Sequence, residues 1–360
     1  MTLRLTSVRA GVGMAALGLA LSACGGGGGT APAPAPLPSP APAPGIPAGR
    51  DAAIAAAIAA AKLSAATDPA CSVDRLGDFY WEIGDAASST PIAAQAQGAG
   101  SVTAATRFNI ASASKWVFGA YVLEKKGIAA VKGTPAILDA LRFTSGYTGL
   151  DEQACVGTLT FGACLAAGTH GVLAPNPAAV GKFAYDSAHD QKLAAIDLGL
   201  DNTTSRQFDL EMQSVMGLPS TINMGVIIPL PAGGLSTSAT DYAVFLRRMM
   251  NRQLVIGAHL GEDSVCANPS TCPAEVAYSP IAALNEPWRY SYNHWVESQD
   301  GKGQVDAFSS PGKWGFYPWI TPDRKFYGIL SRHDTQPVAY GSSVTCGRQI
   351  RKAFLAAWNG

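Results

Sequence analysis

Residues 109–116 read Asn-Ile-Ala-Ser-Ala-Ser-Lys-Trp, and within them Ser112 and Lys115 form a Ser-x-x-Lys pair. Three residues are almost one turn of an α-helix, so the two side chains share a face of the helix predicted here. A serine hydroxyl is a weak nucleophile near neutral pH. An amine in a partly dry pocket gives up its own proton more readily and can then remove the serine's proton. The pair indicates nucleophilic catalysis, but the same spacing also occurs at solvated helix ends, so the rest of the sequence must decide.

The N-terminus has the pattern of an export signal. Arg4 and Arg9 precede an apolar stretch from about Val12 to Leu21, which is too short for a stable membrane anchor. Residues 21–24, Leu-Ser-Ala-Cys, resemble a bacterial lipobox. The resemblance implies that residues 1–23 are removed and that Cys24 is lipidated; an ordinary cleavage site is the alternative. Because Gly25 rather than Asp follows Cys24, the resemblance favours the outer over the inner membrane, in the periplasm or at the surface.

Composition separates a tether from a folded domain. Residues 24–49 contain five consecutive glycines and an Ala-Pro run, which predict a flexible and then semi-extended tether. Residues 50–360 have the composition of a globular enzyme domain. The net charge is zero and only 14% of residues are charged, so the sequence shows no basic surface for nucleic acid. We expect a monomer attached to the lipid bilayer through Cys24.

Six cysteines follow Cys24, and an even count in an exported chain favours disulfides. Zinc is the competing interpretation, but the spacings lack a Cys-x-x-Cys pair and no histidine completes a zinc-ligand pattern. We predict no metal. Two pairs would close short loops and the third would join the chain ends, which gives Cys155–Cys164, Cys266–Cys272 and Cys71–Cys346.

The order of predicted elements indicates an α/β (α+β) fold. A helix is expected over residues 51–65, with Ile54 and Ile58 on its apolar side at four-residue spacing. A β-hairpin over residues 79–97 follows, and residues 325–332 resemble a buried strand before a C-terminal helix. The middle of the chain, about residues 130–285, is richer in helices and loops. We therefore expect an antiparallel sheet built from both chain ends and flanked by the N- and C-terminal helices, with a mostly helical insertion.

In this context the Ser-x-x-Lys pair resembles that of the serine β-lactamase and penicillin-binding-protein superfamily, especially its class C-like esterase and amidase branch. Further motifs occur in the family's order from residue 50 to 360. They are a Leu-x-x-Thr-Ser-Gly turn at 141–146, a Tyr-x-Ser element at 185–187, and the segment Gly-Gly-Leu-Ser-Thr-Ser at 233–238, which is similar to the family's Gly-Gly-Leu-x-Ser-Thr. The resemblance implies that Ser112 is the nucleophile and that Lys115 and Tyr185 transfer protons. Ser187 stands where many relatives have Asn and is expected to face the substrate.

The family's third element is a triplet on the strand that lines the cleft, and two registers compete for it. Lys313-Trp314-Gly315 imitates the Lys-Thr-Gly form, whereas Ser310-Pro311-Gly312 followed by Gly315 fits the form with a neutral first residue better. In the second register the Lys313 amide would share the oxyanion hole with the Ser112 amide. This register supplies no lysine side chain for a substrate carboxylate, so it favours esters or amides. The aromatic residues 288–319 are either a binding wall or core.

The resemblance implies a serine hydrolase of the esterase or amidase type with no cofactor, acting on small or oligomeric substrates. One alternative is a D,D-peptidase or β-lactamase acting on peptidoglycan peptides or β-lactams. Another is a non-catalytic sensor or binding lipoprotein with the same fold. His189 also invites a Ser-His interpretation with Asp186 or Asp190 as the orienting acid. No Gly-x-Ser-x-Gly segment supports an α/β-hydrolase.

Overall fold

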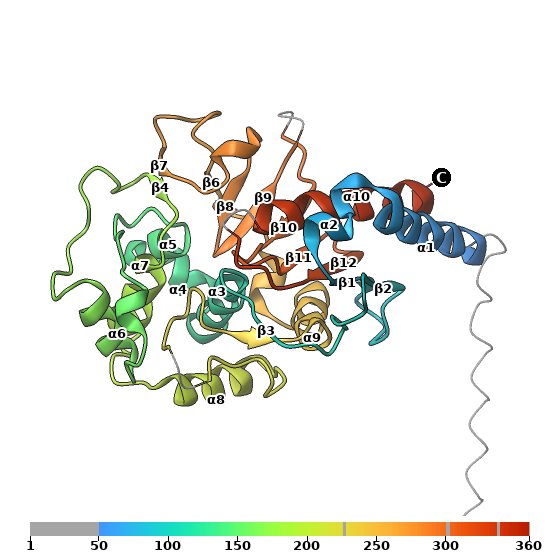
Figure 1. Ribbon diagram of the computed structural model, residues 1–360. Helices are drawn as coiled ribbons and strands as arrows, with labels where there is room; N and C mark the ends of the chain where they lie inside the picture. Colours follow the sequence, from blue (N-terminus) through green and yellow to red (C-terminus); the bar gives the residue numbers. More distant parts are fainter. Residues whose placement is uncertain (1–49, 226–227, 300–302, 337–338, 360) are drawn as a thin grey trace, which may run out of the picture. The chain divides into compact units, whose positions relative to one another are not determined.

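The computed structural model describes residues 50–225, 228–299, 303–336 and 339–359 (Figure 1). The predicted signal peptide, Cys24 and almost the whole tether lie outside these residues. Within them, no helix is both long and apolar enough to cross a membrane.

An eight-stranded antiparallel sheet forms the centre, in the order β2-β1-β12-β11-β10-β9-β8-β6. β1 pairs with β12, so that Tyr80 lies opposite Ser331 and Asp85 opposite Phe326. The sheet thus joins strands from both ends of the domain. Its strands are β1 (Phe79–Asp85), β2 (Ala93–Gln97), β6 (Val265–Cys266), β8 (Arg289–Ser291), β9 (His294–Glu297), β10 (Ala307–Ser309), β11 (Tyr317–Ile320) and β12 (Phe326–Ser331).

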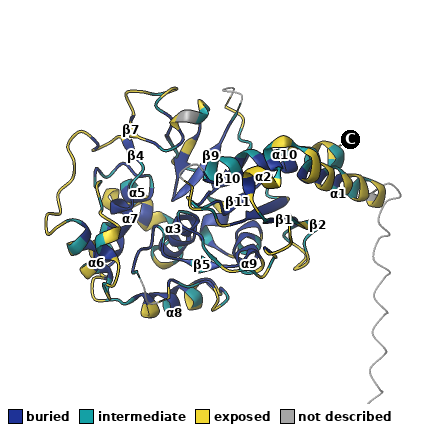
Figure 2. Ribbon diagram, in the orientation of Figure 1, coloured by how far each residue is buried: buried dark blue, intermediate teal, exposed yellow. Residues whose placement is uncertain are grey.

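Side chains alternate across this sheet and build a separate core on each face. Along β12, Phe326 and Leu330 belong to one core, whereas Tyr327 and Ile329 belong to the other. This is the two-residue period of a strand that is buried on both faces. Figure 2 shows the central strands buried, with exposed residues mainly on the outer helices and loops.

The terminal helices α1 (Arg50–Thr67) and α10 (Ala339–Asn359) pack side by side and share a core with one face of the sheet (Figure 1). The predicted helix is present, but its buried side is not centred on Ile54 and Ile58, which are only half-buried. Small side chains are buried instead, because they allow the two helices to approach closely: Ala57, Ala61 and Ala65.

The six cysteines pair as the sequence predicts. Cys71 and Cys346 are bridged with their Cα atoms 4.8 Å apart. The helix α10 starts at Ala339, so Cys346 lies well inside it rather than at its beginning. The other bridges are Cys155–Cys164 and Cys266–Cys272.

The other face of the sheet shares its core with α3 (Ala113–Lys126), α8 (Ser205–Met216) and α9 (Ala239–Met250). The remaining helices are α2 (Val73–Leu76), α4 (Ile128–Gly133), α5 (Pro135–Leu141), α6 (Phe161–Gly168) and α7 (Ala188–Lys192). Short 3₁₀ or π turns complete the set: η1 (Pro69–Cys71), η2 (Gln153–Cys155), η3 (Leu193–Asp197), η4 (Val255–Ala258) and η5 (Ala282–Leu284). The predicted antiparallel sheet with an inserted helical region is confirmed.

Two small strand pairs bring distant motifs together. β3 (Phe108–Asn109) pairs with β5 (Ser236–Thr237), which sets the Gly-Gly-Leu segment beside the approach to Ser112. β4 (Phe183–Ala184) pairs in parallel with β7 (Val276–Tyr278) and fixes the backbone just before Tyr185.

Candidate active site

Ser112 lies at the sharp turn between β3 and α3. Ala111 has φ 45°, in the left-handed region that L-residues seldom adopt. Two contacts hold this turn: the Ala111 amide donates to Asn109 Oδ1 at 2.8 Å, and the Ile110 amide to the Leu235 carbonyl at 2.9 Å. Backbone strain of this kind persists only where the surroundings impose it, and it is common at functional sites.

Lys115 reaches back from the first turn of α3 to the serine. Its side chain is buried, and Nζ lies 3.2 Å from Ser112 Oγ. Nζ also donates to the Ala232 carbonyl at 2.8 Å. The sequence predicts the first contact from helical spacing but gives no sign of the second. Ala232 precedes Gly233-Gly234, and a Cβ on Gly234 would lie 2.8 Å from the Leu230 carbonyl, so this turn needs glycine to bring the acceptor to Lys115.

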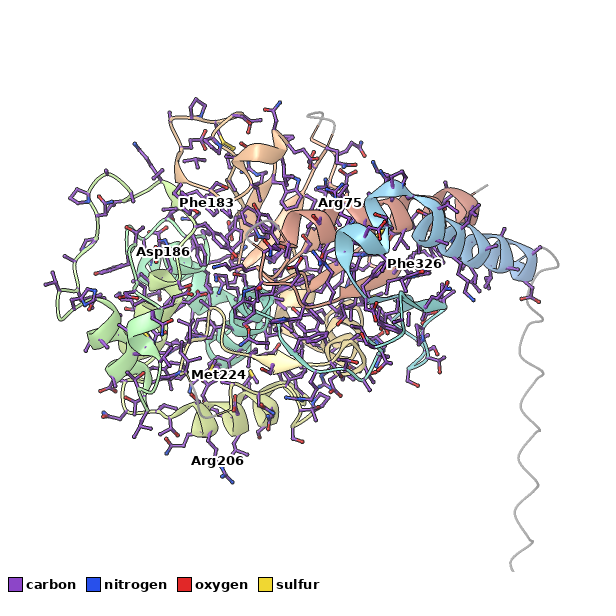
Figure 3. All side chains as sticks on the ribbon, in the orientation of Figure 1. Arg75, Phe183, Asp186, Arg206, Met224 and Phe326 are labelled. Atoms are coloured by element: carbon purple, nitrogen blue, oxygen red, sulfur yellow. A yellow bond between two sulfur atoms is a disulfide. The ribbon has the colours of Figure 1, made fainter. Side chains whose placement is uncertain are left out.

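The ring of Tyr185 lies close to the ammonium group of Lys115. Lys115 Nζ lies 5.0 Å from the centre of the Tyr185 ring. The ring stacks on buried Trp295 with centroids 5.2 Å apart. Phe183 and Asp186, both labelled in Figure 3, bracket the tyrosine along the chain. The structure therefore brings together the three residues predicted to be catalytic.

A cavity of about 290 Å³ adjoins Tyr185. Its charged lining residue is Asp186, whose carboxylate already accepts the amides of Gly149 at 2.8 Å and Ala188 at 2.8 Å. The lining otherwise consists of small, neutral or aromatic residues: Thr148, Gly149, Asn176, Ala179, Ala184, Tyr185, Ala277 and Tyr278. The cavity therefore has one carboxylate, which is already hydrogen-bonded, among neutral lining residues.

Ser187 does not take the orientation expected of a substrate contact. It is buried at the N-terminus of α7, where its hydroxyl donates to the Glu152 carboxylate. It is not among the residues that line the cavity. The Ser187 hydroxyl is thus engaged by the Glu152 carboxylate and does not reach the cavity.

The segment from Ser310 to Lys313 lies against the turn that carries Ser112. Ser310 Oγ donates to the Ser112 carbonyl at 3.0 Å. A Cβ on Gly312 would lie 2.1 Å from the Ile110 carbonyl, so only glycine fits this approach. The Lys313 side chain is exposed. In the described part of the chain, no hydrogen bond from the backbone amide of Ser112 or of Lys313 is found.

His189 is not placed to serve as the base for Ser112. Both ring nitrogens are engaged, with Nδ1 2.6 Å from Ser145 Oγ and Nε2 2.8 Å from the Ala184 carbonyl. Burial lowers the pKa of His189 to about 4, so the ring is neutral at physiological pH. It stacks on Phe143 and stabilises the predicted Thr-Ser-Gly turn.

The aromatic residues near the C-terminal strands are mainly core. Five of them are almost completely buried: Trp288, Tyr290, Tyr292, Trp295 and Trp319. Trp314 is half-buried and faces His333 at 5.4 Å between ring centres. In the described residues, no group of three or more His, Cys, Asp or Glu side chains could hold a metal ion.

By sequence alone, no protein-family model and no curated protein matches the chain. Solved structures match its fold. A putative β-lactamase from Bacteroides dorei has TM-score 0.57 and 18% identity, over 79% of this chain and 96% of that one. EstCE1, a hydrolase with promiscuous acyltransferase activity, has TM-score 0.56 and 13% identity, over 84% of this chain and 99% of that one. The D-amino acid amidase from Ochrobactrum anthropi has TM-score 0.55 and 10% identity, over 78% of this chain and 97% of that one. The chain has the fold of the β-lactamase-like serine hydrolases.

Proposed function

We propose that the protein is a serine hydrolase that forms an acyl-enzyme on Ser112 and cleaves ester or amide bonds of small or oligomeric substrates. The observation that carries this proposal is the 3.2 Å contact between buried Lys115 Nζ and Ser112 Oγ. It occurs at the first turn of α3 within a β-lactamase-like fold. The hydrolase and amidase chemistry named for matching structures agrees with acyl transfer.

The geometry suits a two-step reaction. Ser112 Oγ attacks the carbonyl carbon while its proton passes to the Lys115–Tyr185 pair, and the amides of Ser112 and Lys313 stabilise the oxyanion. The departing alcohol or amine takes the proton as its bond to the acyl carbon breaks. Water then attacks the acyl carbon, the bond from this carbon to Ser112 Oγ breaks, a proton of the water returns to Oγ through the Lys115–Tyr185 pair, and the carboxylic acid leaves.

Substitution of the two proton-transfer residues tests this scheme. We expect Lys115→Ala and Tyr185→Phe each to lower kcat/KM for an ester by on the order of 10²-fold or more, because each removes a group that moves a proton. Tyr278→Phe is the matched control, since Tyr278 lines the same cavity and is largely exposed. Equal effects of Tyr185→Phe and Tyr278→Phe would contradict a proton-transfer role for Tyr185.

Lys313 distinguishes the two registers of the strand triplet. Its exposed side chain agrees with Ser310-Pro311-Gly312 as the triplet, in which only the backbone amide of Lys313 acts. We therefore expect Lys313→Ala to change the hydrolysis of neutral esters by less than about threefold, because the amide survives the substitution. Parallel assays should use neutral esters and carboxylate-bearing substrates. A large loss confined to the carboxylate-bearing substrates would show that the Lys313 ammonium holds the substrate.

The substrate class can be tested directly with p-nitrophenyl esters, amide oligomers and cephalosporins. Faster cleavage of short-chain esters supports the proposal. Preferential turnover of cephalosporins, with labelling by a fluorescent penicillin, would favour a D,D-peptidase or β-lactamase. Labelling without any turnover would favour a sensor or binding protein. Attachment to the envelope through Cys24 is also a proposal, and labelling with radioactive palmitate would test it.

A further inference from the structure

Asn176 belongs to the loop of residues 169–182, between α6 and β4, where the described chain forms no helix or strand (Figure 1). It lies between Pro175 and Pro177. Proline fixes its own φ and restricts the residue before it to extended backbone. The Asn176 amide also donates to the Gly146 carbonyl at 2.8 Å. Asn176 is therefore tied to the Thr-Ser-Gly turn, although the loop around it is irregular.

The side chain of Asn176 is held at one end. Its Oδ1 accepts the Ala178 amide at 3.0 Å, which orients the carboxamide. No hydrogen bond from its Nδ2 to another described residue is found. Asn176 lines the cavity of about 290 Å³ that adjoins Tyr185. A carboxamide has two N–H donors on Nδ2, so these donors are what the side chain has left for a ligand.

The cavity wall obtains its carboxamide from this loop and not from the Tyr-x-Ser element. Ser187 is the residue that the sequence predicts to face the substrate, but its hydroxyl donates to Glu152 and it does not line the cavity. Among the described lining residues, Asn176 supplies the one carboxamide. Asn176 is thus placed to make the polar contact that Ser187 does not make.

The charge of the cavity restricts the kind of group that Asn176 can bind. Asp186 lines the same cavity, and its carboxylate accepts the amides of Gly149 and Ala188. Its negative charge repels an anionic ligand. The Nδ2 donors of Asn176 need an acceptor, which an ammonium group lacks. A neutral carbonyl oxygen satisfies both conditions.

We propose that Asn176 is a specificity-determining residue whose Nδ2 donates to a second, uncharged carbonyl of the substrate, apart from the carbonyl that Ser112 attacks. Tyr185 connects the two places, because it lines the cavity and its ring lies 5.0 Å from Lys115 Nζ. The substrate class is an ester or amide with a further ketone, ester or amide carbonyl, as in an oligoester or oligoamide. This inference rests on the proposed function.

The test is the variant Asn176→Asp, which keeps an oxygen for the Ala178 amide and replaces the Nδ2 donors by an oxygen. Two series of esters are compared: p-nitrophenyl esters of straight-chain acids and acetates of straight-chain alcohols, each with and without one ketone. In at least one series, the wild type should show kcat/KM about fivefold higher or more for the ketone-bearing ester, mainly through KM, as one net hydrogen bond provides. Asn176→Asp should reduce this ratio to about one.

Ser187→Ala is the matched control, because its hydroxyl is bound to Glu152 beside the cavity, and it should keep the ratio. Asn176→Ala covers the case in which Asn176→Asp does not fold. The residue is exposed and the flanking prolines hold its backbone, so this variant should fold and also reduce the ratio to about one. An unchanged ratio in a folded Asn176 variant, a loss in Ser187→Ala, or no ketone preference in the wild type would overturn the proposal.

Binding without turnover separates this inference from the hydrolase proposal. In Ser112→Ala, which cannot form the acyl-enzyme, ¹⁵N NMR follows the side-chain amide of Asn176, assigned by its absence in Asn176→Asp. The probes are neutral N-acetylglycine N-methylamide and the anion N-acetylglycinate. The neutral probe should shift the resonance at a lower concentration than the anion, and no shift or equal shifts would refute the subsite. If the wild type cleaves no ester, a shift by the neutral probe still supports the subsite and rejects only the hydrolase proposal.

Discussion

Ser112→Ala is expected to lose hydrolysis and covalent labelling together, with kcat/KM lowered by at least about 10³-fold. The substitution removes the proposed nucleophile while Lys115 and Tyr185 remain. Proton transfer without a nucleophile cannot form an acyl-enzyme, so the remaining rate comes from water in the cavity. The measurements are ester hydrolysis and gel fluorescence after treatment with a fluorophosphonate probe.

Ser114→Ala is the matched control for this loss. Ser114 is fully buried two residues further along, where its hydroxyl accepts the Leu235 amide at 3.1 Å. Its removal costs stability, on the order of 1 kcal/mol for one hydrogen bond, but leaves the nucleophile in place. The variant should still react with the probe. Near-normal hydrolysis by Ser112→Ala would refute an acyl-enzyme on this residue.

The sequence could predict those features of the site that depend on local geometry. Ser112 and Lys115 meet because three residues on a helix place side chains on one face, whatever the rest of the fold does. The strands at the chain ends were also predictable, since Phe79, Trp81 and Ile83 alternate and are buried on one face of β1. Both predictions depend only on residues that are a few positions apart in the sequence.

Contacts across the fold could not be predicted in this way. Lys115 donates to the carbonyl of Ala232. Every residue has such a main-chain group, so the sequence does not indicate which one Lys115 contacts. Ser187 turns towards Glu152 rather than the cavity because a loop 35 residues earlier supplies an acceptor. In both cases tertiary packing supplies the hydrogen-bond acceptor. A sequence motif identifies the donor residue but not this acceptor.

Burial was equally hard to infer from residue type. Ala57, Ala61 and Ala65 of α1 are buried and its isoleucines are only half-buried, because the close approach of α10 favours small side chains over large ones. Aromatic residues near the site presented the same ambiguity, since Trp295 could line a cavity or fill a core. It is buried and supports the Tyr185 ring from behind. Its contribution to the site is thus to orient another residue.

The disulfide between Cys71 and Cys346 should contribute far more to stability than the bridge between Cys155 and Cys164. The first spans 275 residues and the second spans 9. In the chain-entropy model, loop length sets the stabilisation at about 5 kcal/mol for the long loop and about 2–3 kcal/mol for the short one. The comparison is well matched, because all four cysteines are almost completely buried and their replacement by Ala leaves similar cavities.

We expect the double variant Cys71→Ala/Cys346→Ala to lose about 2–3 kcal/mol more free energy of unfolding than Cys155→Ala/Cys164→Ala in urea denaturation. Non-reducing peptide mapping of the wild type must first show both bridges. Equal losses, or free Cys71 and Cys346, would contradict a covalent link between η1 and α10. The long bridge belongs to the core under α1 and α10, whereas Ser112 begins a helix of the other core. Molecules of the variant that remain folded should therefore still be labelled at Ser112, so that stability and catalysis respond to different substitutions.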